Sequence, residues 1–306
     1  MSITVVGSVA FDSIETPFGK AERCLGGSAT YFSVAASFFS PVNVVGVVGE
    51  DFTDDDMAIF SGRRINIDGL QRVKGAKTFF WSGQYGFDLN VANTRDTQLN
   101  VFAEFRPRLD ELQRKPQVLF LANIDPELQM EVLRQCVRPR IVALDTMNYW
   151  ISSKREALKK ILAAVDLAVF NEAEVRQFMD EPNLVRAGRG IVALGPRGLV
   201  IKRGEYGVLM ITRDTIFAAP AYPLENVFDP TGAGDTFAGG FLGYLASRPE
   251  AGDRDLRRAI IFGSVLASFT VEKFSLDRLR EITLTDVYER YRDFRLMTHF
   301  EAYDEE

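Results

Sequence analysis

Short apolar strands alternate with helices through the middle of the sequence, and this alternation constrains the fold more than any other feature. Runs typical of buried strands occupy residues 3–7, 42–49, 118–122, 141–144 and 167–170, and helix-like segments occupy 27–39, 126–136, 153–164 and 171–179. Strands that alternate with helices form parallel sheets covered on both faces. We therefore predict an α/β fold, with a doubly wound, mainly parallel sheet and helices on both faces.

The stretch from about residue 68 to 105 interrupts this rhythm. Residues 78–81 (TFFW) are strand formers, and residues 98–105 alternate apolar with polar side chains, as a half-exposed strand does. Strands without helices between them favour a small antiparallel sheet. We predict a β lid formed mainly by about 68–105 plus part of 10–28, within a single domain of residues 1–306.

The remaining elements follow from local patterns. Residues 53–65 read as a helix, with Thr53 or Asp54 as its N-cap. Residues 200–202 and 208–210 form a predicted hairpin around Gly204 and Gly207. Further helices are expected over 235–247, 255–272 and 285–297.

Composition excludes several classes of protein. The net charge of −6 argues against nucleic acid as a partner, because such binding depends on Lys and Arg neutralising phosphates. With one histidine and two cysteines, a His-based zinc site, a Ser-His-Asp triad and a disulfide framework are not expected. No apolar run is long enough to cross a membrane, and MSITVVGSVAFD lacks the features of a signal peptide. We expect a cytoplasmic protein.

The segment with the most chemical information is DPTGAGDTF, residues 229–237, which opens an apolar helix. Consecutive small residues at a helix start expose backbone N–H groups at the positive end of the helix dipole, where anions bind. Gly232, Ala233 and Gly234 could hold the charge of a transferring phosphoryl group. Asp235, beside them, could accept a proton from an attacking hydroxyl. The alternative is an ordinary glycine-rich turn with a carboxylate in the first turn of its helix.

Two other phosphate-binding motifs do not match. The chain has no Gly-Lys-Ser/Thr for a Walker A loop. A dinucleotide fingerprint fails because Phe237 stands where its third glycine should be, and no such motif follows the first strand. The second mismatch argues against a nicotinamide-dependent oxidoreductase.

With these residues the sequence resembles the PfkB, or ribokinase-like, family of carbohydrate kinases. DPTGAGDTFAGGF is similar to the family's C-terminal signature, and GGSAT, at residues 26–30, to its N-terminal one. GVVGED (46–51), NEAE (171–174) and KRGEYG (202–207) stand between them in the family's order. The resemblance covers residues 3 to about 275 and implies an ATP-dependent kinase that uses Mg²⁺.

The resemblance also implies residue roles around the phosphates. Asp235 matches the catalytic base, and Gly232, Ala233 and Gly234 match the anion hole. Asn171 and Glu174 match an element that organises Mg²⁺ and phosphates through water, and Asn171 is also assigned to ATP. The alternative for this pair is a capping box, in which Asn171 caps the following helix and Glu174 caps it in return.

Further positions are assigned to substrate, nucleotide and cation. The resemblance implies substrate binding by Asp12, Gly26, Gly27 and Asn123. It implies ATP binding by Lys202, Gly204, Gly207 and Ser264. Asp229 and Thr231 match positions near a monovalent-cation site, for example for K⁺. Asp12 also follows the first buried strand, at the sheet edge where α/β proteins bind ligands, and its alternative is a turn cap.

One position departs from the family pattern. The N-terminal signature usually carries Asn where this chain has Tyr31, which puts ribose-type recognition through that Asn in doubt. Tyr31 could pack on a substrate ring or belong to the core. Trp81 and Phe79 in the lid could likewise face the substrate, or pack as strand aromatics usually do.

We therefore predict transfer of the γ-phosphate of ATP to a hydroxyl, most simply a primary one, of a sugar, polyol or nucleoside. A carbohydrate or polyol is favoured over a nucleoside. The alternatives are an adenosine-type nucleoside kinase and a non-catalytic sugar- or nucleotide-binding protein of the same fold. The expected partners are the small-molecule substrate and a second copy paired through the lid, with no nucleic acid and no membrane.

Overall fold

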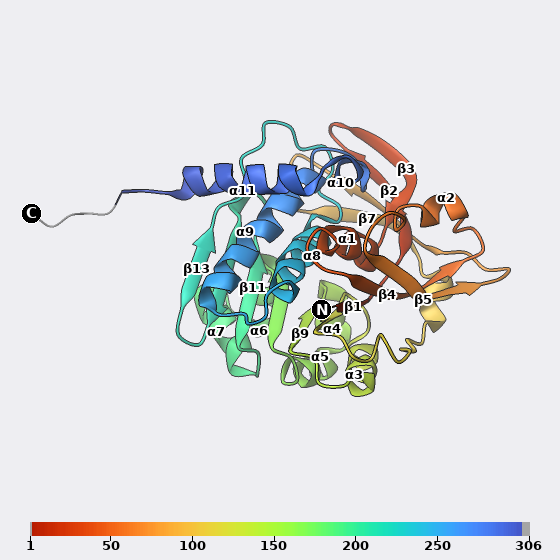
Figure 1. Ribbon diagram of the computed structural model, residues 1–306, viewed down its shortest axis with the longest axis horizontal. Helices are drawn as coiled ribbons and strands as arrows, with labels where there is room; N and C mark the ends of the chain where they lie inside the picture. Colours follow the sequence, from red (N-terminus) through yellow and green to blue (C-terminus); the bar gives the residue numbers. More distant parts are fainter. Residues whose placement is uncertain (1, 302–306) are drawn as a thin grey trace, which may run out of the picture.

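A large twisted sheet runs through the centre of the computed structural model, which describes residues 2–301 (Figure 1). Its strands over these residues stand in the order β13 (Ile216–Ala219), β12 (Val208–Thr212), β11 (Gly198–Lys202), β10 (Leu167–Asn171), β9 (Ile141–Asp145), β8 (Val118–Leu121), β1 (Ile3–Val6), β4 (Val42–Gly49) and β5 (Ile65–Val73). All pairings from β11 to β5 are parallel, whereas β12 and β13 add antiparallel at one edge. The mainly parallel sheet is confirmed.

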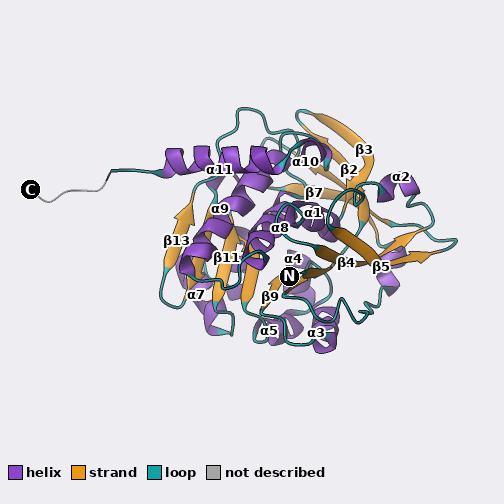
Figure 2. Ribbon diagram, in the orientation of Figure 1, coloured by secondary structure: helices purple, strands orange, loops and turns teal. Residues whose placement is uncertain are grey.

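Helices cover both faces of this sheet (Figure 2). One face carries α1 (Ser28–Ala36), α8 (Ala233–Ala246), α9 (Asp253–Thr270), α10 (Asp277–Glu281) and α11 (Leu284–Thr298). The other carries α3 (Pro126–Gln135), α4 (Asn148–Ser153), α5 (Arg155–Leu162), α6 (Glu172–Met179) and α7 (Leu184–Ala193). Val5 and Val6, neighbours on β1, belong to the two different cores. Burial on both faces explains why the strands read as unbroken apolar runs.

A second, smaller sheet forms the lid. Its strands β3 (Gly19–Gly26), β2 (Ala10–Thr16), β6 (Phe79–Tyr85) and β7 (Ala92–Gln98) stand in that order. The outer pairings β3–β2 and β6–β7 are antiparallel, and the central pairing β2–β6 is parallel. Residues 10–26 therefore supply half of the lid strands.

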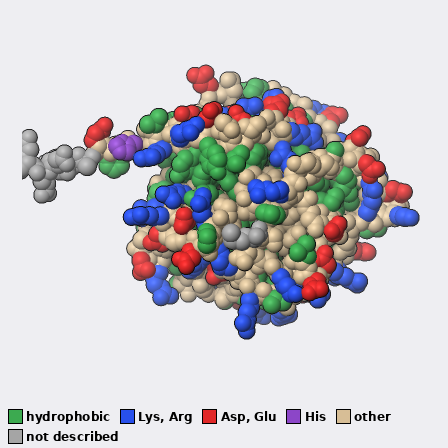
Figure 3. Space-filling view, viewed as in Figure 1, with side chains coloured by type: hydrophobic (Ala, Val, Ile, Leu, Met, Phe, Trp, Pro, Cys, Tyr) green, Lys and Arg blue, Asp and Glu red, His purple; other side chains and the backbone are tan. Residues whose placement is uncertain are grey.

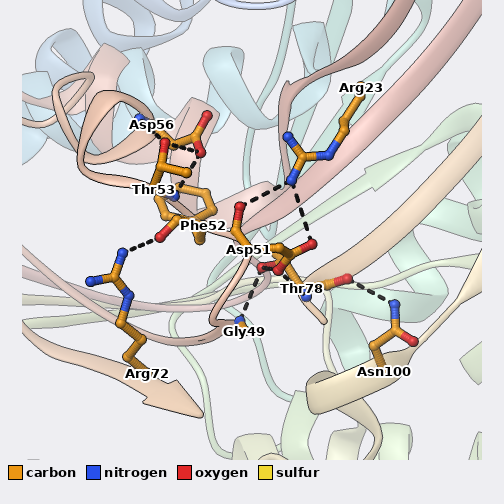
Figure 4. A network of polar contacts seen from close by, with 9 residues as sticks. All are labelled: Arg23, Gly49, Asp51, Phe52, Thr53, Asp56, Arg72, Thr78 and Asn100. Atoms are coloured by element: carbon orange, nitrogen blue, oxygen red, sulfur yellow. Dashed lines mark hydrogen bonds and ion pairs between the residues drawn. The ribbon is translucent and has the colours of Figure 1, made fainter. Parts of the chain in front are cut away.

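A polar network ties the lid to the end of β4 (Figure 4). The Asp51 carboxylate accepts hydrogen bonds from the backbone N–H and the hydroxyl of Thr78, both at 2.7 Å. The guanidinium of Arg23, on β3, donates to the Asp51 carbonyl at 3.0 Å. Asn100 donates its side-chain N–H to the Thr78 carbonyl at 2.8 Å. Asp51 thus ties edge strand β3 and the start of central strand β6 to one point of the large sheet.

Three expectations about this region are wrong. Residues 68–73 lie in β5, which pairs with β4 of the large sheet and not with the lid. Residues 98–105 do not form a strand: the chain turns at Asn100, which has a left-handed φ of 47°, and residues 100–104 form the 3-10 helix η1 (Asn100–Glu104). The helix expected over 53–65 is the single turn α2 (Asp54–Met57), although Thr53 does cap it.

Apolar side chains gather beneath α11 on the face shown in Figure 3, where basic and acidic side chains are otherwise interspersed. Helices α8, α9 and α11 are joined by a stack of Tyr244, Phe262 and Tyr291, with ring centroids 4.7 and 4.3 Å apart. Among residues 2–301, no helix is both long and apolar enough to span a bilayer.

Candidate active site

The first turn of α8 places small residues and a carboxylate together. Gly232 caps this helix with φ 73°, a left-handed conformation that favours glycine. A Cβ at Gly232 would also lie 2.4 Å from the ring of Tyr31. The N–H of Ala233 donates to the Pro230 carbonyl at 3.2 Å. The backbone of 232–234 therefore turns at the positive end of a long helix, a suitable place for an anion.

Asp235 lies in this first turn and is partly buried. Burial, assisted by the Asp145 carboxylate and opposed by the Lys202 ammonium, raises the pKa of its carboxyl to about 7. A carboxyl with a pKa near neutrality accepts a proton more readily than an ordinary aspartate, and a substantial fraction of it is still ionised at neutral pH. The structure thus gives Asp235 the electrostatics of a general base.

Lys202 and Asp145 form a buried ion pair beside this turn. The Lys202 Nζ lies 2.8 Å from the Asp145 Oδ2, and the two side chains are 19% and 4% exposed. A Cβ at Gly234 would lie 3.1 Å from the Lys202 Nζ, so the ammonium adjoins the start of α8. Burial alone lowers the pKa of Lys202, but the carboxylates of Asp145 and Glu174 outweigh it and raise the pKa above its usual value. Lys202 is therefore a permanent positive charge at this point.

Asn171 and Glu174 connect β10 to α6. The Asn171 side chain accepts from the Glu174 N–H at 2.8 Å, and the Glu174 carboxylate accepts from the Asn171 N–H at 2.7 Å. This is the capping box of the alternative interpretation. Burial, opposed by Lys202 and assisted by Asp145, raises the pKa of Glu174 to about 7. The capping residue Glu174 therefore also places a carboxylate near the Lys202 ammonium.

Asp12 lies on lid strand β2 and is 5% exposed. A Cβ at Gly26, on β3, would be 1.9 Å from the Asp12 Oδ2, so only glycine leaves room for this carboxylate. Gly27 follows with φ 93° and precedes α1. Burial, then the charges of Asp229 and Asp235, raise the pKa of Asp12 to about 8. The structure thus brings Asp12, predicted to bind the substrate, close enough to Asp235, the predicted base, for their charges to interact.

The loop before α8 contacts both the lid and the C-terminal helices. The Asp229 carboxylate accepts from the Thr231 N–H at 2.8 Å and the Ser275 N–H at 3.0 Å. The Thr231 hydroxyl donates to the phenol oxygen of Tyr85, on lid strand β6, at 3.1 Å. Lid strand β6 and the loop before α8 are therefore in direct contact.

The turn between β11 and β12 adopts the expected glycine geometry. Gly204 and Gly207 have φ values of 55° and 85°. Asn90, in the loop between lid strands β6 and β7, reaches this turn: its Nδ2 lies 3.4 Å from the Glu205 Oε1. A Cβ at Gly204 would collide with the Asn90 Oδ1 at 1.6 Å. The lid thus meets the site at two points, this turn and the loop before α8.

Two predicted residues stand apart from these contacts. The Asn123 Oδ1, past the end of β8, accepts a hydrogen bond from the Trp150 indole at 3.0 Å. Ser264, on α9, is buried, and its hydroxyl has no hydrogen-bond partner among residues 2–301. Their assigned roles in substrate and ATP binding stay predictions.

Comparison with known proteins gives the family. Residues 2–281 match the model of the pfkB family carbohydrate kinases. The chain belongs to this family. It is accordingly an ATP-dependent kinase, related to kinases of sugars and nucleosides.

Curated relatives of this pfkB kinase differ in their acceptors. A cytidine kinase from Thermococcus kodakarensis is 29% identical over 257 residues, covering 81% of this chain and 90% of the relative. A ribokinase from Lactococcus lactis is 25% identical over 287 residues, covering 89% and 91%. The nucleoside kinase of Methanocaldococcus jannaschii has the same fold, with a TM-score of 0.77 at 20% identity over 95% of this chain and 98% of that one.

Sequence reasoning missed two residues of the candidate site. Asp145 ends the apolar run IVALD, and a carboxylate at the carboxyl end of a buried strand is a signal that could have revealed it. Tyr85 carried no such signal, because its contact with Thr231 depends on how the lid folds over the loop. For Tyr31, the core alternative is correct: it is 1% exposed and packs in the larger core.

Proposed function

We propose that this pfkB kinase transfers the γ-phosphate of ATP to a hydroxyl, in the simplest case a primary one, of a nucleoside or sugar, with Asp235 as the general base. The observation that carries the proposal is the raised pKa of Asp235, about 7, at the start of an anion-binding helix. A non-catalytic binding protein would gain nothing from a carboxylate desolvated in this way.

The proposed steps of phosphoryl transfer follow from the charges placed around the site. The acceptor hydroxyl, held by Asp12 beside Gly26 and Gly27, gives its proton to Asp235 as its oxygen attacks the phosphorus. The bond to the ADP oxygen breaks, and the negative charge on the phosphoryl oxygens is balanced by the 232–234 backbone and the Lys202 ammonium. The lid excludes water, so that the phosphoryl group goes to the acceptor and not to solvent.

The negative charge of the carboxylates around Lys202 suits a magnesium ion. Three carboxylates, those of Asp145, Glu174 and Asp235, act on one another's ionisation around the single ammonium of Lys202. Among residues 2–301, no group of three or more His, Cys, Asp or Glu side chains is arranged to hold a metal by itself. We assign Glu174 to a hydrated Mg²⁺, which it would contact through water, because Mg²⁺ usually keeps several of its water ligands. We assign Asn171 to the phosphates. The metal would supply positive charge to the ATP phosphates.

The nucleotide and cation assignments complete the proposal. Lys202, the turn at Gly204 and Gly207, and Ser264 are assigned to ATP. Asp229 and Thr231 are assigned to a monovalent cation site. The cytoplasmic location and a homodimer through the lid stay predictions.

Asp235→Asn tests the proposal. The variant should bind ATP and acceptor with unchanged affinity and lose about 10²- to 10⁴-fold in kcat, the usual range for a general base. Asp255→Asn makes the same change in the first turn of α9, away from the site, and should retain full activity. Wild-type kcat in Asp235→Asn, with the acceptor that supports turnover, would overturn the assignment.

A further inference from the structure

Trp81 shares a lid face with Asp12. In the parallel pairing of β2 with β6, Trp81 is the register partner of Asp12. In the antiparallel pairing of β6 with β7, Trp81 is the register partner of Thr97. Register partners on neighbouring strands project to the same side of a sheet. Tyr85, four residues further along β6, projects to this side as well and contacts the loop before α8. The side chain of Trp81 therefore lies on the face of the lid that is turned toward the active site.

The indole of Trp81 is held flat along this face. A Cβ at Gly83 would lie 2.1 Å from the Cη2 and 2.3 Å from the Cζ2 of the indole, so the ring covers Gly83 directly. The indole Nε1 donates a hydrogen bond to the Thr94 hydroxyl, on β7, at 3.2 Å. One ring face thus lies against the strand, and the glycine and the threonine together fix its orientation.

The neighbouring aromatics of β6 have packing roles that Trp81 does not share. Phe80 packs against the larger core, and Phe79 stacks on Phe102 with ring centroids 5.3 Å apart. Trp81 is only half-buried, and neither core described for residues 2–301 includes it. An oriented aromatic face that the core does not use, next to a carboxylate that binds hydroxyls, is suited to a flat ring attached to a polyhydroxyl group.

We propose that Trp81 is the platform on which the base of a nucleoside stacks while Asp12 holds its sugar hydroxyls. This inference rests on the proposed kinase function and narrows its acceptor to nucleosides. Stacking on an indole selects flat rings without reading their hydrogen-bonding edges, so both a pyrimidine and a purine nucleoside fit. A free sugar fills only the Asp12 end and leaves the platform uncovered.

Steady-state kinetics with cytidine, inosine and ribose tests the platform. Trp81→Ala should raise the KM for the nucleosides about 5- to 100-fold, the usual effect of removing a stacking partner, and leave the KM for ribose and ATP unchanged. Trp81→Phe should recover most of the loss, because it keeps an aromatic face. Gly83→Ala should act like Trp81→Ala, because it forces the indole off the strand. Ser82→Ala, on the opposite face of β6, is the matched control and should leave every KM unchanged.

Tryptophan fluorescence tests stacking without phosphoryl transfer. In the Asp235→Asn background, cytidine should quench the emission and ribose should not. Trp81→Phe, which leaves Trp150 as the other of the two tryptophans, should abolish the quenching. Equal rises in KM for cytidine and ribose, or quenching that survives Trp81→Phe, would overturn the platform and leave the kinase proposal intact. Quenching that depends on Trp81, in a protein that turns over ATP with none of these acceptors, would support the platform and count against the proposed function.

Discussion

The Lys202 ammonium lies 2.8 Å from the Asp145 carboxylate, and this ion pair joins the carboxyl ends of β11 and β9 across the intervening strand β10. The two partners act in opposite directions on Asp235: Asp145 raises the pKa of its carboxyl and Lys202 lowers it. The ion pair therefore helps to set the basicity of the proposed catalytic residue.

Asp145→Asn should move the acid limb of the pH–kcat profile to lower pH. The substitution removes the negative charge that raises the pKa of Asp235 and frees the Lys202 charge that lowers it. The same variant should lower kcat at neutral pH, because a weaker base takes the hydroxyl proton less readily. An acid limb that stays in place would show that Asp145 does not act on the base. Asp166→Asn, at the other end of the sheet, is the control.

The wild-type enzyme should lose kcat/KM for the acceptor as pH falls through two steps. Burial, together with nearby carboxylates, raises the pKa of Asp12 to about 8 and, in the same way, that of Asp235 to about 7. In the proposed function each acts in its ionised form, Asp12 in binding and Asp235 in proton transfer. We expect a shallow decline below about pH 8 and a steeper one below about pH 7, measured in overlapping buffers of constant ionic strength. A flat profile down to pH 5 would contradict both assignments.

Asp12→Asn should weaken acceptor binding and stabilise the fold at alkaline pH. Each lost charge-assisted hydrogen bond to a hydroxyl costs about 1.5–3 kcal/mol, so the acceptor KM should rise about 10- to 100-fold while the ATP KM barely changes. The folded-state pKa of about 8 lies above the ordinary value, so the wild type loses stability as pH rises from about 4 to 8, because folding in this range must return to the Asp12 carboxyl a proton that the unfolded chain has released. Asp12→Asn has no ionisable group at this position, so it does not lose stability in this way as pH rises.

Thermal melting of both proteins from pH 5 to 9 checks the second part of this prediction. The melting temperature of Asp12→Asn minus that of the wild type should increase with pH and level off above about 8. A difference that shrinks with rising pH would mean that the ionised carboxylate has partners in the fold, as the turn-cap interpretation requires.

Tyr85→Phe should loosen the lid. The variant removes the acceptor of the 3.1 Å hydrogen bond from Thr231, the direct side-chain link between β6 and the loop before α8. Hydrogen exchange in residues 79–98 should slow when acceptor and an ATP analogue bind to the wild type, and the slowing should be smaller in the variant. Ser82→Ala, on the other face of β6, is the control. Equal protection in the two proteins would count against a role of Tyr85 in closing the lid.

The large sheet could be predicted from the sequence because its strands are buried on both faces and read as apolar runs. The lid could be predicted only in part. All of β7 is exposed, so its sequence, ANTRDTQ, carries no burial pattern that marks a strand. The apolar alternation after Gln98 suggested a strand, but the left-handed turn at Asn100 and its hydrogen bond to the Thr78 carbonyl redirect the chain into η1.

Site residues within local motifs could be predicted, whereas those that depend on tertiary contacts could not. Gly232 and Asp235 share one helix start, so their proximity follows from the sequence. The approach of Asp145 to Lys202 depends on strand order, and the residues next to Asp145 in the chain do not indicate that Lys202 is its partner. The position of Trp81 on the inner face of the lid likewise follows from its register with Asp12, which sequence spacing does not give.

Glu174→Gln should raise the Mg²⁺ concentration needed for half-maximal rate and leave the fold unchanged. Gln can keep both hydrogen bonds of the capping box with Asn171, because its amide oxygen accepts as the carboxylate does, so the melting temperature should stay within about 1 °C. What the variant loses is the negative charge beside Lys202, which the water shell of Mg²⁺ would contact. The measurement is a Mg²⁺ titration of the rate at fixed, saturating ATP and acceptor. Asp286→Asn, in the capping box of α11, makes a comparable change far from the site and should leave the titration unchanged. If Glu174→Gln and Asp286→Asn gave the same curve as the wild type, the carboxylate of Glu174 would have a capping role alone.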